Sequence, residues 1–189
     1  MSIAAPPETR YTSERYLALV DAGALGPDDK VELLEGEIVA MAPEGPRHEV
    51  AIDKTADALR VAVAGRAAVR TQHSVHAGAR SVPEPDIAVV PGRHDDYARA
   101  RPRIALLVVE VSDSSLTRDR LRKAPVYAAA GIPEYWIVNL RDDVVEIFRS
   151  PDRAAARYTE TRVAHLGERL ELVALPGASV AVDDLLPRR

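Results

Sequence analysis

The apolar positions of the chain repeat with two periods, one typical of helices and one typical of strands. Within residues 47–63, Ile52, Leu59 and Val63 share one face of a helix. Residues 104–109 are apolar without alternation, which indicates a strand covered on both faces. The pattern predicts, in chain order, a helix at 12–22, a hairpin of strands 31–34 and 37–41, a helix at 47–63, strands at 67–75, 86–90 and 104–112, a helix ending near residue 130, strands at 135–140 and 144–149, weaker strands at 158–163 and 170–175, and a turn at 182–186.

This order of elements predicts the fold class α/β, with helices packed around a central mixed sheet. The helix after the third strand of that sheet can be capped by a serine among residues 112–115 and ended by Gly131. Pro125 lies inside this helix and removes its hydrogen bond to residue 121, so we expect a kink there.

Length and composition indicate a single soluble domain. A chain of 189 residues can bury about two thirds of its unfolded surface. Its 47% of apolar and 29% of charged residues are ordinary for a globular protein. Residues 1–10 are expected to form a tail, residues 11–149 the core and residues 150–189 a C-terminal β extension.

The composition excludes several kinds of site and location. Cysteine is absent, which excludes disulfides, iron–sulfur clusters and cysteine-type zinc sites. Residues 1–8 lack a charged start followed by an apolar stretch, so no signal peptide is predicted. No apolar run approaches the ~20 residues of a membrane-spanning helix. We therefore expect a cytoplasmic protein with no membrane partner.

The net charge of −4 argues against a nucleic-acid partner, since such partners usually require a basic surface. Charge acts locally, however, and two segments are basic. They contain Arg93, Arg99, Arg101 and Arg103 in the first segment, and Arg118, Arg120, Arg122 and Lys123 in the second. These side chains are either solvated or in contact with phosphates, and the sequence leaves both interpretations open.

Two acidic residues stand at the ends of predicted strands. Asp86 follows Pro85 and opens one strand, and Glu110 lies near the end of the next. The connection between these strands has no helical period, which suits an antiparallel return. Because the start of one antiparallel strand lies beside the end of its neighbour, we expect both carboxylates at one edge of the sheet.

The helix that follows adds a cation to the same edge. It crosses over to a strand that we expect to run parallel to the Glu110 strand, so it begins near Glu110. Asp119 and Lys123 are four residues apart on it and share one face that can point back at the acids. Only three of the 25 basic residues are lysines, which hints that an ammonium is needed at position 123.

An unpaired carboxylate in a central strand is expensive to bury, so Glu110 requires a compensating charge. Two acids with a nearby lysine are suited to metal-assisted phosphodiester cleavage. Oxygen ligands, without cysteine or clustered histidine, favour Mg²⁺ or Mn²⁺ over zinc. The alternative is a strand-end acid that simply pairs with an arginine or lysine.

At these residues the chain resembles the PD-(D/E)XK nuclease superfamily, and more narrowly a bacterial family described as putative restriction endonucleases of unknown biological role. The resemblance covers residues 11–149. It rests on the segments Glu32-Leu33-Leu34-Glu35-Gly36-Glu37, Pro46-Arg47-His48, Pro85-Asp86, Glu110-Val111-Ser112, Asp119-Arg120 with Lys123, and Gly131-Ile132-Pro133-Glu134-Tyr135-Trp136-Ile137-Val138.

The resemblance implies a restriction-endonuclease-like core and divalent-metal phosphodiester hydrolysis. It assigns the metal to Asp86, Glu110 and the carbonyl group of Val111. The superfamily usually has a lysine two residues after the glutamate, where this chain has Ser112. In the narrower family the cation has moved to the helix, which implies that Lys123 orients the attacking water or stabilises the transition state.

Three further residues receive roles with stated alternatives. Glu32 supplies another carboxylate to the site or is a solvated hairpin residue. His48 begins the buried stripe of its helix and has either a structural role or a role in the site. Asp119 is expected to pair with Lys123 and to fix the direction of its side chain without binding the metal. Ser112 is expected to support the site in the same way, also without binding the metal.

The leading hypothesis is a Mg²⁺-dependent DNA endonuclease that acts as a homodimer, because cutting two strands with one site per chain favours two-fold symmetry. Arg99, Arg101, Arg118 and Arg122 are its candidate nucleic-acid contacts. The alternative is a catalytically weak or inactive nuclease-fold module that binds nucleic acid or a protein partner. A metal-dependent hydrolase of another phosphoester is a third possibility.

Overall fold

The structure, a computed structural model, describes residues 10–188. Apart from Arg10, the predicted tail lies outside the described residues. The helices and strands in chain order are α1 (Ser13–Asp21), β1 (Val31–Leu34), β2 (Glu37–Ala40), α2 (Pro46–Val63), β3 (Ala67–Thr71), β4 (Ile87–Pro91), β5 (Leu107–Ser112), α3 (Leu116–Arg118), a π-helical turn (Asp119–Lys123), α4 (Ala124–Ala130), β6 (Glu134–Asn139), β7 (Val144–Asp152), β8 (Arg157–Ala164), β9 (Arg169–Glu171) and β10 (Ser179–Ala181). Short 3₁₀ turns lie at Pro27–Asp29, His94–Tyr97 and Val182–Asp184.

Six strands form the central sheet in the order β3-β4-β5-β6-β7-β8. The pair β5–β6 is parallel, and each of the other neighbouring pairs is antiparallel. The α3–α4 segment connects the two parallel strands, as a crossover between parallel strands requires. The predicted mixed sheet, the antiparallel return between β4 and β5 and the crossover from β5 to β6 are therefore confirmed.

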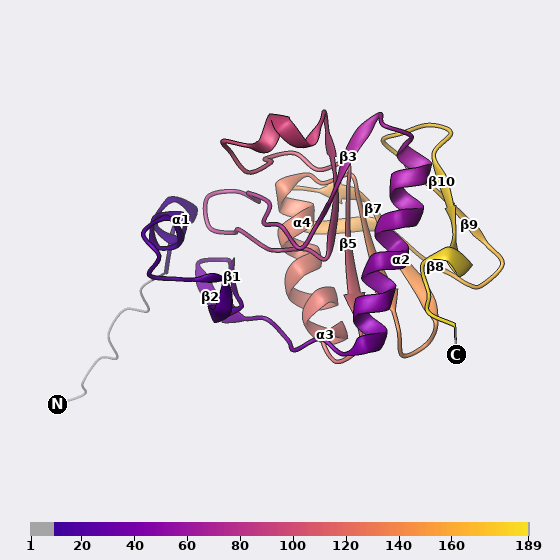
Figure 1. Cartoon of the computed structure of the whole chain (residues 1–189), viewed down its shortest axis with the longest axis horizontal. Helices are drawn as coiled ribbons and strands as arrows, with labels where there is room; N and C mark the ends of the chain where they lie inside the picture. Colours follow the sequence, from indigo (N-terminus) through magenta and orange to yellow (C-terminus); the bar gives the residue numbers. More distant parts are fainter. Residues whose placement is uncertain (1–9, 189) are drawn as a thin grey trace.

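Helices cover both faces of this sheet (Figure 1). One core cluster joins α2 residues such as Leu59 with Val109 of β5 and Trp136 of β6. The other joins Tyr127 of α4 with the alternate positions of the same strands, Val108 and Tyr135. Because neighbouring residues of a strand point to opposite faces, the continuous apolar run in β5 serves both layers.

An N-terminal unit of α1, β1 and β2 lies to one side of the central sheet and its helices, at the left in Figure 1. Its helix α1 is capped by the Thr12 side chain, which accepts from the backbone N–H of Arg15. Its hairpin β1–β2 turns at Glu35-Gly36, and Leu33 forms an isolated bridge with Val82. A small third core cluster around Tyr16, Leu33 and Val82 fixes this unit to the loop that leads to β4.

Several strands begin or end at other residues than predicted. The strand predicted at 67–75 ends at Thr71, because Gln72 has a left-handed backbone with φ +50°. The strand predicted at 104–112 begins at Leu107, and the Ile104 side chain is exposed. The strand predicted at 170–175 is reduced to β9, and β10 was not predicted.

The predicted border between core and extension stays a prediction, and strand β7 runs across residue 150. The structure contains, within residues 10–188, no helix whose length and apolar character would let it span a membrane.

Candidate active site

The sheet brings Asp86 and Glu110 to one edge. Asp86 immediately precedes β4, where Ile87 pairs with Val109 of β5 in antiparallel register. The backbone N–H of Val111 donates to Asp86 Oδ2 at 2.7 Å, so the aspartate is tied to the residue after Glu110. Both carboxylates are buried, with 7% and 3% of their residue surface exposed. Antiparallel pairing thus places the two acids together, as the sequence predicts.

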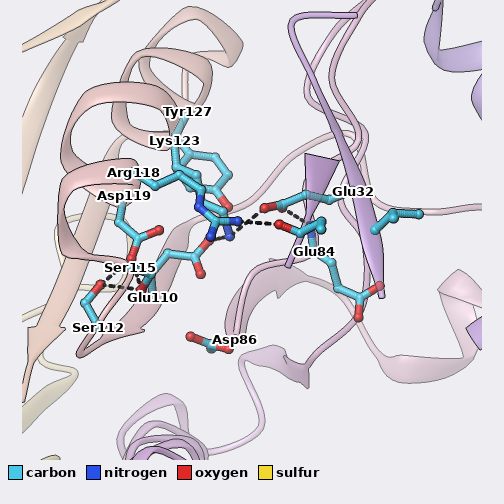
Figure 2. Close-up of polar contacts among 12 residues, drawn as sticks. Glu32, Glu84, Asp86, Glu110, Ser112, Ser115, Arg118, Asp119, Lys123 and Tyr127 are labelled. Carbon is cyan, nitrogen blue, oxygen red and sulfur yellow. Dashed lines mark hydrogen bonds and ion pairs between the residues drawn. The ribbon is translucent and has the colours of Figure 1, made fainter. Parts of the chain in front are cut away.

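Glu110 is held by two donors from the crossover helix (Figure 2). Lys123 Nζ donates to its Oε1 at 2.9 Å, and the Tyr127 hydroxyl donates to the same oxygen at 2.6 Å. Because both bonds use Oε1, Oε2 is the oxygen of Glu110 that can act as a metal ligand. The predicted approach of Lys123 to Glu110 is present in the structure.

Glu32 joins this cluster from the hairpin. Its Oε1 lies 3.3 Å from Lys123 Nζ, and its Oε2 accepts from the backbone N–H of Glu84 at 3.2 Å. Only 1% of Glu32 is exposed, so the alternative of a solvated hairpin residue is wrong. Lys123 therefore lies between two carboxylates from distant parts of the chain.

Lys123 reaches the site from a π-helical turn rather than from the regular helix that was predicted. In this turn the N–H of Ala124 donates to the carbonyl group of Asp119, five residues earlier. The predicted pairing of Asp119 with Lys123 was wrong, since the Asp119 carboxylate accepts instead from Ser112 and, at 2.7 Å, from Ser115. Asp119 and Ser112 thus fix the start of the turn against the end of β5.

His48 enters the site from the first turn of α2. Its Nε2 donates to the carbonyl oxygen of Val111 at 2.7 Å and lies 3.6 Å from Asp86 Oδ2. A carbonyl oxygen only accepts, so Nε2 carries a proton, and in the neutral imidazole Nδ1 then holds the lone pair. Within residues 10–188, buried Nδ1 has no hydrogen-bond partner, and Glu44 Oε2 lies 3.9 Å away. The His48 side chain is 14% exposed and lies on the inner side of α2, one turn before Ile52, where its ring faces the acids.

Burial governs the ionisation of the cluster. It raises the pKa of Asp86 to about 6 and raises that of Glu110 well above its ordinary value, although Lys123 opposes both shifts. Burial would lower the pKa of Lys123, but Glu110 and Glu32 together outweigh it, so the pKa is raised and the ammonium persists. Burial and Glu110 raise the pKa of Tyr127, which keeps its hydroxyl protonated as a donor.

The side chains of Glu32, Asp86, Glu110 and Lys123 belong to the lining of a pocket of about 200 Å³, which has a large excess of acidic over basic residues. The acidic residues of its lining are Glu32, Glu44, Glu84, Asp86, Glu110, Asp113 and Asp119, and the permanent cations are Arg47, Arg118 and Lys123. Carboxylates so close together repel one another unless a cation or protons compensate them.

The residues present fit a divalent metal ion. One ligand atom from each of Glu44, His48 and Asp86 lies within 4.8 Å of the others. Within the described residues Nδ1 of His48 has no hydrogen-bond partner, and in the neutral imidazole its lone pair could bind a metal. The second lone pair of the Val111 carbonyl oxygen is not used by His48, since a carbonyl oxygen has two. Oxygen-rich sites of this kind suit Mg²⁺ or Mn²⁺.

The sequence prediction missed Glu44 and Glu84, which line the pocket, and Tyr127, which donates to Glu110 from the buried helix. Tyr127 follows Lys123 by four residues, a spacing that could have placed it beside Glu110. Glu44 precedes His48 by four residues but lies before the helix begins, so no helical pattern reveals it. Glu84 precedes Asp86 by two residues, and burial raises its pKa.

The four predicted nucleic-acid contacts lie in different surroundings. Arg118 lines the acidic pocket and donates to the carbonyl oxygen of Ala40 at 2.6 Å. Arg122 pairs with Glu37 at 2.7 Å. Arg99 and Arg101 belong to the loop after β4, and Arg101 donates to Ser74.

Two comparisons with known proteins agree with this architecture. The structure is similar to the crystal structure of a "putative nuclease belonging to DUF820" from Anabaena variabilis ATCC 29413, with a TM-score of 0.71 and 16% sequence identity over 93% of this chain and 97% of that chain. At this identity the similarity shows a shared fold. Among curated proteins, no sequence matches this chain. Residues 13–183 match the family Uma2, described as "Putative restriction endonuclease". The restriction-endonuclease-like fold predicted for this chain is confirmed. The chain belongs to the Uma2 family.

Proposed function

We propose that the protein is a divalent-metal-dependent endonuclease that hydrolyses phosphodiester bonds in DNA. The observation that carries this proposal is the buried pair Asp86 and Glu110 beside a single buried ammonium, Lys123, in a strongly acidic pocket. A phosphodiester is itself an anion, so such a pocket would repel it unless a metal ion is bound. Membership of the Uma2 family supports a nuclease.

The ligands in this proposal are Asp86, Glu110 through Oε2 and the carbonyl group of Val111, with Mg²⁺ or Mn²⁺ as the ion. Glu44 and His48 extend the donor set on the side of Asp86. When bound, the metal would supply a water of lowered pKa and would neutralise charge on the phosphate.

The remaining side chains would position the metal ligands and stabilise charge on the phosphate. Lys123 replaces the usual strand lysine, whose place is taken by Ser112. Held between Glu110 and Glu32, its ammonium faces the pocket and would stabilise negative charge on the phosphate oxygens. Tyr127 and Glu32 fix Glu110 and Lys123 respectively.

Supercoiled plasmid tests this function directly. With Mg²⁺ or Mn²⁺ we expect nicked and linear products, and no products with EDTA. Asp86→Ala, Glu110→Ala and Lys123→Ala should each lower the cleavage rate at least a hundredfold, since each removes a ligand or the only buried cation of the site. Glu49→Ala is the matched control, an exposed acid on the same helix as His48. Cleavage that persists unchanged in Asp86→Ala would come from another site or a contaminant.

The second candidate function is a nuclease-fold module that binds nucleic acid or protein without cutting. One observation favours it, since both ion-pair partners found for Lys123 are carboxylates of the protein itself. Purified protein that binds DNA but cleaves neither DNA nor RNA with any divalent metal would support this module and contradict the enzyme.

A homodimer and DNA contacts through Arg118 and Arg122 belong to the same proposal. Arg118 lies at the rim of the acidic pocket, where it can reach a phosphate. Arg122 is half-buried and would have to exchange Glu37 for a phosphate. Sedimentation with and without DNA measures the number of chains per complex.

A further inference from the structure

The acidic pocket opens into two neighbouring hollows through a shared residue. Glu84 lines the pocket and both hollows. The first hollow lies between α1, the hairpin and the loop after β3, and it also shares Met41 with the pocket. The second lies between the end of β3 and the loop after β4. The two hollows share Gln72, Ser74 and Arg101, so they form one groove that leads away from the pocket.

The charge of this groove is opposite to that of the pocket. Its permanent cations are Lys30, Arg70, Arg99 and Arg101, and its acidic residue is Glu84, at the junction. The protein as a whole carries a net charge of −4, so this concentration of positive charge next to the acids is not a general property of its surface. A basic groove on an acidic protein marks the place where an anionic polymer can bind.

The groove is also built to keep its cations in place. Arg101 Nε donates to Ser74 Oγ at 2.9 Å, which orients its guanidinium. The Arg70 guanidinium lies 5.3 Å from the ring centroid of Tyr97. In the described part of the chain, the buried Nε of Arg70 has no hydrogen-bond partner. Because this Nε has almost no accessible surface, a phosphate in the groove would contact the terminal amino groups of the Arg70 guanidinium.

We propose that the DNA strand cut in the pocket continues past Glu84 into this groove, where Lys30, Arg70, Arg99 and Arg101 bind the phosphates that flank the cut on one side. The inference rests on the proposed function, since it assumes a nucleic-acid substrate. It also gives the path of the DNA strand away from the cut, because these four cations lie on the Glu84 side of the acidic pocket. Arg99 and Arg101 thereby receive a specific role within the general contact predicted for them.

The salt dependence of DNA binding tests the groove. The double variant Arg99→Ala/Arg101→Ala is compared with Arg60→Ala/Arg157→Ala, which removes the same charge from exposed positions on α2 and β8. Binding of a duplex and of its single strands is measured by fluorescence anisotropy with Ca²⁺ as a non-cleaving ion. In the groove variant the slope of log K against log salt should fall by about two, roughly one for each lost phosphate contact. The control pair should keep the wild-type slope.

Neutral methylphosphonate linkages test on which side of the cut the DNA strand enters the groove. Placed one at a time along a cleaved oligonucleotide, they should weaken wild-type binding more on the groove side of the cut than on the other side, and this difference should disappear in the groove variant. Equal slopes in the two double variants, or symmetric interference, would overturn the groove. Wild-type protein that neither cuts nor binds any nucleic acid would instead overturn the proposed function, so the two failures are distinct. Thermal unfolding confirms that each variant is folded.

Discussion

At the scale of residues, the Tyr127 hydroxyl and the Lys123 ammonium both donate to one oxygen of Glu110. This arrangement fixes the rotation of the carboxylate and directs Oε2 away from the helix. A donor that holds a metal ligand from behind commonly changes metal affinity by tenfold or more. Tyr127 is therefore a positioning residue for Glu110 in the proposed metal site.

Replacing Tyr127 with phenylalanine tests this role, because only the hydroxyl group is lost. We expect Tyr127→Phe to weaken Mn²⁺ binding about tenfold in calorimetry without DNA. Tyr158→Phe is the matched control, since it removes another buried hydroxyl group, whose bond goes to the carbonyl oxygen of Ile132. If both variants bind Mn²⁺ as the wild type does, Tyr127 has no positioning role. Equal losses in both variants would indicate a general effect of losing a buried hydroxyl.

Asp86 makes the stability of the protein depend on pH. Its pKa is raised by burial from 3.8 to about 6, so between these values the folded state holds a proton that the unfolded state has lost. Stability rises with pH only where the unfolded state holds more protons, so this group makes stability fall from pH 4 to pH 6. The change is roughly 3 kcal/mol, at about 1.4 kcal/mol per pH unit.

Urea unfolding in EDTA measures this effect. The free energy of unfolding of wild-type protein should fall, relative to that of Asp86→Asn, between pH 4 and pH 6, with a constant difference above pH 7. The asparagine cannot ionise and retains an acceptor for the N–H of Val111. A difference that does not change with pH would mean that Asp86 titrates near its ordinary value.

At the scale of elements, the sequence was sufficient to place the two acids and Lys123, but not the contacts of Asp119 and His48 around them. Asp86 and Glu110 follow from strand order alone, because antiparallel pairing of β4 and β5 is a topological property. The neighbours of Asp119 depend on where a helix changes its period, and no repeat of apolar residues signals a π-helical turn. The orientation of His48 depends on a bond to the Val111 carbonyl group, which belongs to a strand 63 residues later.

The π-helical turn shows how the helix accommodates Pro125, and the predicted kink itself stays a prediction. Pro125 cannot donate a hydrogen bond, but the turn immediately before it shifts the bonding pattern by one residue, so that Ala124 bonds to Asp119. Helix α4 then begins with proline near its first position, where the missing N–H costs little. At the C-terminal end, β9 and β10 have three residues each, too few to show an alternation.

At the scale of the whole molecule, charge is divided between an acidic pocket and a basic groove that meet at Glu84. With a net charge of −4, the protein repels DNA at long range, and attraction arises only close to the groove. A divalent ion in the pocket would reverse the local repulsion at the point where the scissile phosphate must lie. DNA affinity should therefore depend on metal ions even when no cleavage takes place.

This dependence can be separated from catalysis with Ca²⁺ and a neutral variant. Wild-type protein should bind a DNA duplex at least tenfold more weakly in EDTA than in Ca²⁺, since each repulsive contact of about 1.4 kcal/mol is a tenfold change. Asp86→Asn removes one pocket charge and should bind more tightly than wild type in EDTA, with little further gain from Ca²⁺. Asp53→Asn removes an exposed charge from α2 and should behave as wild type. If EDTA leaves the affinity of the wild type unchanged, the acids of the pocket do not face the phosphates. Acids that face the phosphates would repel them once the metal ion is removed, and binding would weaken.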